Sequence, residues 1–78
     1  MSSPLTEKQT KLLSLFKLAI NNERQAQALY RETLLYCEDE SLRTIIESFI
    51  REESKHEQAL LSKYKEIRKT AGYESVEP

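Results

Sequence analysis

The chain has 78 residues, of which 38% are hydrophobic and 32% are charged, and its formal net charge is −1. This length allows one small domain, and the composition is typical of a folded chain rather than a disordered one. The near-zero net charge argues against nucleic-acid binding. The single Cys excludes an internal disulfide and a four-cysteine metal site within one chain. The single Gly argues against a many-stranded β fold, because the turns of such a fold need Gly.

The first predicted element is a helix over about residues 4–36. Ser3-Pro4 offers one N-terminus, because Pro suits the first helical position. Thr6 and Gln9 offer a second N-terminus with the spacing of a capping box. No Gly or Pro interrupts the rest of this segment.

A polar turn is predicted over residues 37–41, followed by a second helix over about residues 42–70. Asp39 or Ser41 can cap this helix, and the only Gly of the chain follows its predicted end. The tail over residues 71–78 is expected to be frayed.

Both predicted helices carry a seam of residues spaced alternately by four and three, the pattern of helices packed in a bundle. In the first helix this seam is Leu12, Phe16, Ala19, Glu23, Ala26, Tyr30, Thr33 and Cys37. In the second it is Leu42, Ile46, Phe49, Glu53, His56, Leu60, Tyr64 and Ile67. Further apolar residues beside the seams make each apolar face wider than a two-helix contact uses. We therefore expect an all-α fold, an antiparallel two-helix hairpin that dimerises into a four-helix bundle.

Three seam positions are strongly polar: Glu23, Glu53 and His56. A buried carboxylate is costly unless it is paired or coordinated. Glu23 and Glu53 lie at similar distances from the turn, so at 1.5 Å rise per residue they are expected within roughly 2–3 Å of the same height. His56 follows Glu53 by one helical turn on the same face.

Two hairpins related by a twofold axis would bring together four Glu and two His. This is the ligand set of carboxylate-bridged two-metal sites in four-helix bundles. Iron or manganese suits these ligands, and zinc can also bind them. The sequence therefore predicts a two-metal site between two chains.

Other polar residues near this group have two interpretations each. Tyr30, two turns from Glu23, is either a core aromatic residue or a phenol that donates a hydrogen bond or an electron near the metals. Glu52 and Glu57 are expected on solvated neighbouring faces, with capture of incoming cations as the alternative. Cys37 is expected to be a small buried hydrophobic residue.

The segments Glu23–Tyr30 and Phe49–Leu60 resemble the first- and second-helix motifs of the rubrerythrin-like branch of the ferritin-like superfamily, the second with its Glu-x-x-His. The resemblance covers roughly residues 16–67. Because the chain has one helix pair and lacks rubredoxin cysteines, it is more similar to the encapsulated ferritins, short chains that pair to build a di-iron ferroxidase site.

This resemblance implies that Glu23, Glu53 and His56 are iron ligands and catalytic residues, and that Tyr30 is the nearby catalytic tyrosine. It also implies ring-like homo-oligomers inside an encapsulin shell, although the tail from Gly72 does not look like the usual targeting peptide. The expected function is oxidation of Fe(II) to Fe(III), with two ions per subunit pair, for iron storage or detoxification.

Two alternatives stay open: a rubrerythrin-like peroxide reductase, and a metal-free helical oligomerisation module. The N-terminus does not resemble a signal peptide, and no apolar run approaches the length of a membrane span. We therefore expect a cytoplasmic protein that contacts neither membrane nor nucleic acid, located inside an encapsulin compartment if the resemblance extends that far.

Overall fold

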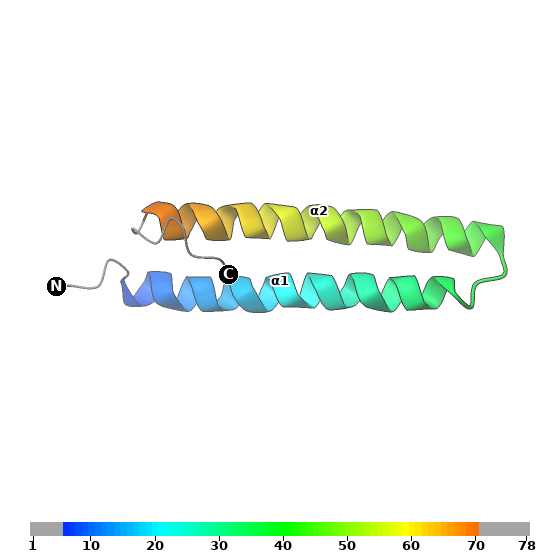
Figure 1. Ribbon diagram of the computed structural model, residues 1–78, viewed down its shortest axis with the longest axis horizontal. Helices are drawn as coiled ribbons and strands as arrows, with labels where there is room; N and C mark the ends of the chain where they lie inside the picture. Colours follow the sequence, from blue (N-terminus) through cyan, green and yellow to red (C-terminus); the bar gives the residue numbers. More distant parts are fainter. Residues whose placement is uncertain (1–5, 71–78) are drawn as a thin grey trace.

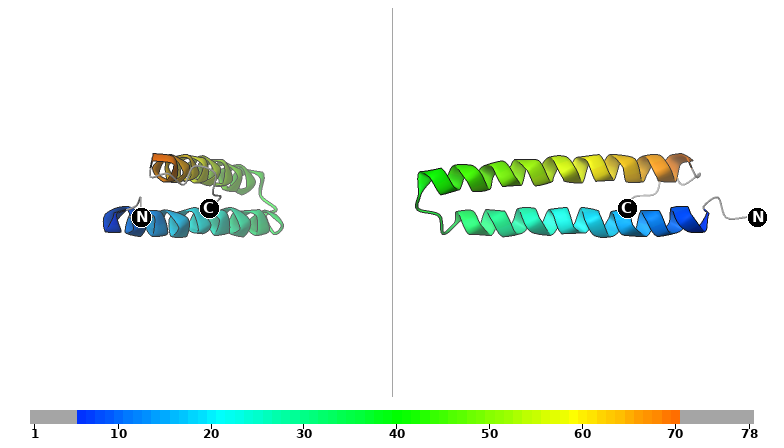
Figure 2. Two further views of the ribbon diagram at one scale, coloured as in Figure 1. Left: turned by 60° about the vertical axis from the view of Figure 1, so that its left-hand side comes forward. Right: turned by 180° about the vertical axis from the view of Figure 1, so that it is seen from behind.

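The computed structural model describes residues 6–70, which form two antiparallel α-helices, α1 (Glu7–Leu34) and α2 (Glu40–Thr70), joined by a short connection (Figure 1). The helices lie side by side along their whole length when the molecule is turned (Figure 2). The predicted all-helical hairpin is therefore confirmed for the described part of the chain. The expected start at Ser3-Pro4 and the tail that bears on shell targeting lie outside the described residues.

The N-terminus of α1 is a capping box. Thr6 has extended backbone angles (φ −76°, ψ 166°), and its hydroxyl oxygen accepts a hydrogen bond of 3.0 Å from the Gln9 backbone N–H. The Gln9 side-chain oxygen accepts a hydrogen bond of 3.0 Å from the Thr6 backbone N–H in return. The helix therefore begins after Thr6, the second of the two predicted N-termini. The capping box stabilises this start because it satisfies two otherwise unpaired N–H groups.

The α1 helix ends earlier than predicted. It stops at Leu34, and the backbone N–H groups of Leu35 and Tyr36 donate to carbonyls three residues back, at 3.0 Å each. Such tighter bonds close the last turn and release the chain from the helix. The prediction that the helix continues to about residue 36 was therefore too long at this end.

The start of α2 is tied to the end of α1. Asp39 is the cap, as one of the two predicted choices, and its Oδ1 accepts a hydrogen bond of 3.3 Å from the Ser41 N–H. Arg43 donates from Nη1 to the carbonyl oxygens of Leu34 (2.9 Å) and Cys37 (3.3 Å). The Leu34 carbonyl also accepts a hydrogen bond of 3.3 Å from the Cys37 backbone N–H. The guanidinium therefore adds a second bond at the end of α1 and links the connection to α2.

The contact between the helices is rotated from the predicted seam. In α1 the buried residues are Leu13, Ile20 and Gln27, whereas Leu12 of the predicted seam is 41% exposed. In α2 the buried Tyr64 packs with Leu13 and Ile20, while the predicted seam residue Phe49 is 39% exposed. The predicted row of α1 therefore lies at the edge of the contact, whereas the predicted row of α2 contributes the two buried residues of that helix, Ile46 and Tyr64.

The hairpin is a rod, with principal extents of 59 × 17 × 15 Å. Such a thin rod covers few side chains, and many large hydrophobic ones stay exposed: Leu12, Leu15, Leu18, Leu29, Leu35, Tyr36, Leu42, Ile45 and Phe49. Within residues 6–70, neither helix is long and apolar enough to cross a membrane.

Candidate metal centre

Three possible metal ligands meet near the middle of the hairpin. Glu23 comes from α1, and Glu53 and His56 come from α2; each offers one ligand atom, and these atoms lie within 4.8 Å of one another. Nδ1 of His56 lies 3.2 Å from Oε1 of Glu53 and 3.4 Å from Oε2 of Glu23. The side chains that the sequence placed at one height are therefore together in the structure.

Helix geometry explains this convergence. Glu53 and His56 are three residues apart, so they project from neighbouring positions one turn apart on α2. Glu23 reaches them because antiparallel helices bring together residues that lie at similar distances from the connection. The imidazole nitrogen Nδ1, rather than Nε2, faces both carboxylates.

The three ligands differ in exposure. The side chains of Glu23 and Glu53 are 20% and 23% exposed, whereas that of His56 is 61% exposed. His56 is therefore exposed in a single hairpin, and its place in the core of a four-helix bundle stays a prediction. Its row on α2 also presents Phe49, and this row lies outside the helix–helix contact.

The two carboxyl groups act on each other's protonation. A hydrogen bond with Glu53, followed by burial, raises the pKa of Glu23, while the hydrogen bond with Glu23 lowers the pKa of Glu53. Two carboxylates this close repel each other when both are ionised, so a shared proton relieves the repulsion. A divalent cation relieves the same repulsion, so the pair of carboxylates suits a metal ion.

Tyr30 lies in the layer next to this group. Its ring packs against Phe49 of α2 with the ring centroids 5.5 Å apart and the planes inclined by 48°. This contact supports the interpretation of Tyr30 as an aromatic packing residue, and its part in metal chemistry stays a prediction.

The position of Glu57 differs from the predicted one. Instead of lying on a solvated face, its carboxylate lies between the helices, where Oε2 accepts a hydrogen bond from Arg24 Nε and Oε1 accepts one from Gln27 Nε2, both at 2.7 Å. The Arg24 guanidinium, then the Gln27 amide, lowers the pKa of Glu57. One feature of the sequence indicated this inward position: Glu57 fits the alternating three- and four-residue spacing of Ile50, Glu53, Leu60 and Tyr64.

The lowered pKa of Glu57 predicts how stability depends on pH. The ordinary value is 4.5, so the ionised carboxylate stabilises the fold fully above about this pH, and the contribution is lost as the pH falls through the lower folded-state value. Glu57→Gln is expected to lower the melting temperature of the metal-free protein at pH 7, and the gap from the unaltered chain should close towards pH 3. Thermal unfolding followed by circular dichroism across this pH range tests the prediction. A difference in melting temperature that is the same at every pH contradicts it.

No family model matches the chain, and comparisons with curated proteins and with solved structures also give no match. Two half-buried carboxylates and one exposed imidazole nitrogen converge here, and such hard and borderline donors suit divalent iron, manganese or zinc.

Proposed function

We propose that this protein is a ferroxidase of the encapsulated-ferritin type, in which two hairpins pair and oxidise Fe(II) to Fe(III) at a di-iron site between them. The observation that carries the proposal is the convergence of Glu23, Glu53 and His56 within 4.8 Å in the middle of the hairpin. Storage or detoxification of iron is the role that this chemistry serves.

The surroundings of the metal group support a second hairpin. On α1, apolar side chains that the hairpin leaves exposed or half-buried lie on both sides of the group, and on α2 they lie between the group and the connection. We name these residues the open face: Leu12, Phe16, Ala19, Ala26, Tyr30, Leu42, Ile45 and Phe49. Contiguous exposed apolar surface is typical of an interaction site. Three ligands from one chain are also too few for two ions, and a second copy supplies the other three.

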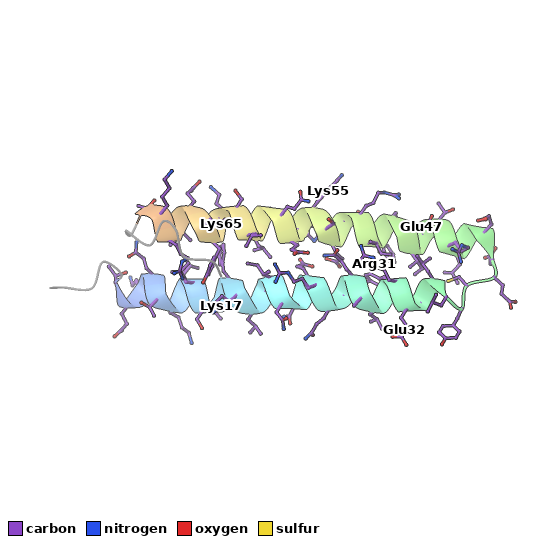
Figure 3. All side chains as sticks on the ribbon, in the orientation of Figure 1. Lys17, Arg31, Glu32, Glu47, Lys55 and Lys65 are labelled. Atoms are coloured by element: carbon purple, nitrogen blue, oxygen red, sulfur yellow. The ribbon has the colours of Figure 1, made fainter. Side chains whose placement is uncertain are left out.

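The distribution of charge favours a second copy turned end for end. Residues 24–53, the half of the hairpin that holds the connection, carry seven acidic and four basic side chains, whereas residues 6–23 and 54–70 carry eight basic and four acidic ones. In Figure 3 Lys17 and Lys65 lie towards the free ends, and Glu32 and Glu47 lie towards the connection. An antiparallel copy places each acidic half beside a basic half, and the central metal groups then face each other.

Each ligand has a role in this proposal. Glu53 of each chain bridges or chelates the ions, and Glu23 with Nδ1 of His56 completes the set of protein ligands of each one. Iron is the substrate: two Fe(II) each lose one electron, and one dioxygen takes up both electrons with two protons to give hydrogen peroxide. The carboxylates bind in their ionised form, so iron binding should weaken as the pH falls.

An anaerobic Fe(II) titration followed by exposure to oxygen tests the proposal. We expect saturation at one iron per chain and then an absorbance band from carboxylate-bound Fe(III). Rapid oxidation by peroxide with a reductase present, instead of by oxygen, would favour the peroxide reductase. The absence of saturable binding would favour the metal-free oligomerisation module, in which the Glu23–Glu53 hydrogen bond is the final state of the pair.

The open face gives a separate prediction about assembly. Phe49→Arg places a charge in the middle of this face, and we expect it to convert the dimer to a monomer in sedimentation-velocity experiments, because an unpaired charge is costly to bury in an interface. Leu18→Arg is the matched control, since Leu18 is 57% exposed and lies away from the metal rows of α1. Equal sedimentation of Phe49→Arg and the unaltered chain would contradict pairing through this face.

A further inference from the structure

One set of contacts in the hairpin is more directional than its apolar core. The Glu57 carboxylate on α2 accepts hydrogen bonds of 2.7 Å from both Arg24 and Gln27 on α1. Gln27 is the buried polar residue of the described chain, at 7% exposure. We name these three residues the Glu57 clamp.

The Glu57 clamp lies within one helical turn of the candidate metal ligands on both helices. Arg24 follows Glu23 directly, and Gln27 lies four residues after it. On α2, Glu57 follows His56 directly and lies four residues after Glu53. Any sliding or spreading of the helices that separates Glu23 from Glu53 must therefore also stretch the two bonds of the clamp.

Apolar packing alone does not impose this alignment. Contacts such as those among Leu13, Ile20 and Tyr64 are non-directional, so they tolerate small shifts of one helix along the other. Charge-assisted hydrogen bonds do not tolerate such shifts, because they weaken when the donor and acceptor move beyond about 3 Å. A shift would also leave the buried Gln27 amide without a hydrogen-bond partner. Polar groups in helical seams fix register in this way.

The connection cannot replace the clamp at the middle of the rod. Arg43 holds the two helices together where it donates to the carbonyls of Leu34 and Cys37, but Glu23 lies eleven residues before Leu34 on α1. At 1.5 Å per residue this is about 16 Å away. A small difference in helix angle at the connection is therefore enough to separate the ligands.

We propose that Glu57 is a positioning residue, which acts through Arg24 and Gln27 to hold Glu23 against Glu53 and His56. It is separate from the candidate metal ligands, because it does not belong to the converging group and its two oxygens accept hydrogen bonds from α1. Its effect on metal binding rests on the proposed function, whereas its effect on the metal-free arrangement does not.

The test compares Glu57→Ala, Glu57→Gln and a control. Glu66→Ala is the control, since Glu66 pairs with Lys63 on the same helix and both side chains are more than 60% exposed. In anaerobic Mn(II) titrations we expect Glu57→Ala to weaken binding about 10–100-fold, as removal of a residue that orients a ligand does. Glu57→Gln keeps one hydrogen-bond acceptor, so its Mn(II) affinity should lie between those of Glu57→Ala and the unaltered chain. Glu66→Ala should bind Mn(II) as the unaltered chain does.

A second readout needs no metal. His56 is the only histidine, so its ring protons give unambiguous NMR signals, and we expect cross-peaks from them to the side chains of both Glu53 and Glu23. In Glu57→Ala the cross-peak to Glu23, on the other helix, should disappear while the one to Glu53 stays. If Glu57→Ala does not fold, the same comparison is made with Glu57→Gln.

The two proposals fail in different ways. If the unaltered chain binds no Mn(II) but the Glu23 cross-peak is lost in Glu57→Ala, the metal proposal is wrong and the positioning role holds. If the folded Glu57→Ala keeps both the Glu23 cross-peak and the unaltered affinity, Glu57 contributes to stability alone and the positioning role is overturned.

Discussion

Glu53→Ala is expected to abolish saturable Fe(II) binding and, with it, oxygen-dependent iron oxidation. Glu53 belongs to the group whose ligand atoms lie within 4.8 Å of one another, and Nδ1 of His56 lies 3.2 Å from its Oε1. Removal of a residue that merely orients a metal ligand costs about 10–100-fold in affinity, so removal of this ligand should cost more than about 100-fold. Anaerobic titration followed by exposure to oxygen measures both effects.

Glu52→Ala is the matched control for this change. It removes the same chemical group from the preceding residue, which is exposed and does not belong to the converging group. It should bind one iron per chain and oxidise it at the unaltered rate. If Glu52→Ala and Glu53→Ala lose binding equally, the loss reflects general negative charge near α2 rather than coordination by Glu53.

The second large effect is stabilisation by metal. A ligand that binds only the folded state, at a free concentration one hundred times its Kd, adds about 2.7 kcal/mol to the free energy of unfolding. For a domain of this size that corresponds to a rise of about 10–20 °C in the melting temperature. We expect this rise with Mn(II) or anaerobic Fe(II), measured by circular dichroism, and its reversal by a chelator.

Variants separate this stabilisation from non-specific binding of cations. The rise should be lost in Glu23→Gln and Glu53→Gln, which keep side-chain shape and remove the carboxylate charge. It should persist in Glu52→Ala. A melting temperature that does not respond to any of these metals would show that the Glu23–Glu53 pair serves the fold without a metal.

The sequence predicted the local features of this hairpin because they depend on residues close together in the chain. The cap formed by Thr6 and Gln9 and the cap at Asp39 satisfy neighbouring N–H groups, so each was among the two starts that the sequence offered for its helix. The end of α1 was less predictable, since no Gly or Pro marks it and Arg43, which donates to the carbonyls of Leu34 and Cys37 there, comes from the other helix.

The convergence of Glu23, Glu53 and His56 could also be predicted from the sequence. It follows from the constant rise of an α-helix and from the position of the turn, so counting residues away from the turn was enough to place two carboxylates at one height. No knowledge of side-chain packing was required for that step.

The tertiary structure alone decided which rows of the two helices face each other. The α1 helix has apolar side chains around much of its circumference, among them Leu12, Leu13, Leu15 and Leu18, so its sequence pattern fits more than one orientation. The structure buries Leu13 and leaves Leu12 at the edge, and the matching rotation of α2 brings Glu57 inward and leaves His56 outward. Rotation of one helix against another depends on the fit of both surfaces at once, and the hydrogen bonds of Glu57 to Arg24 and Gln27 belong to neither helix alone.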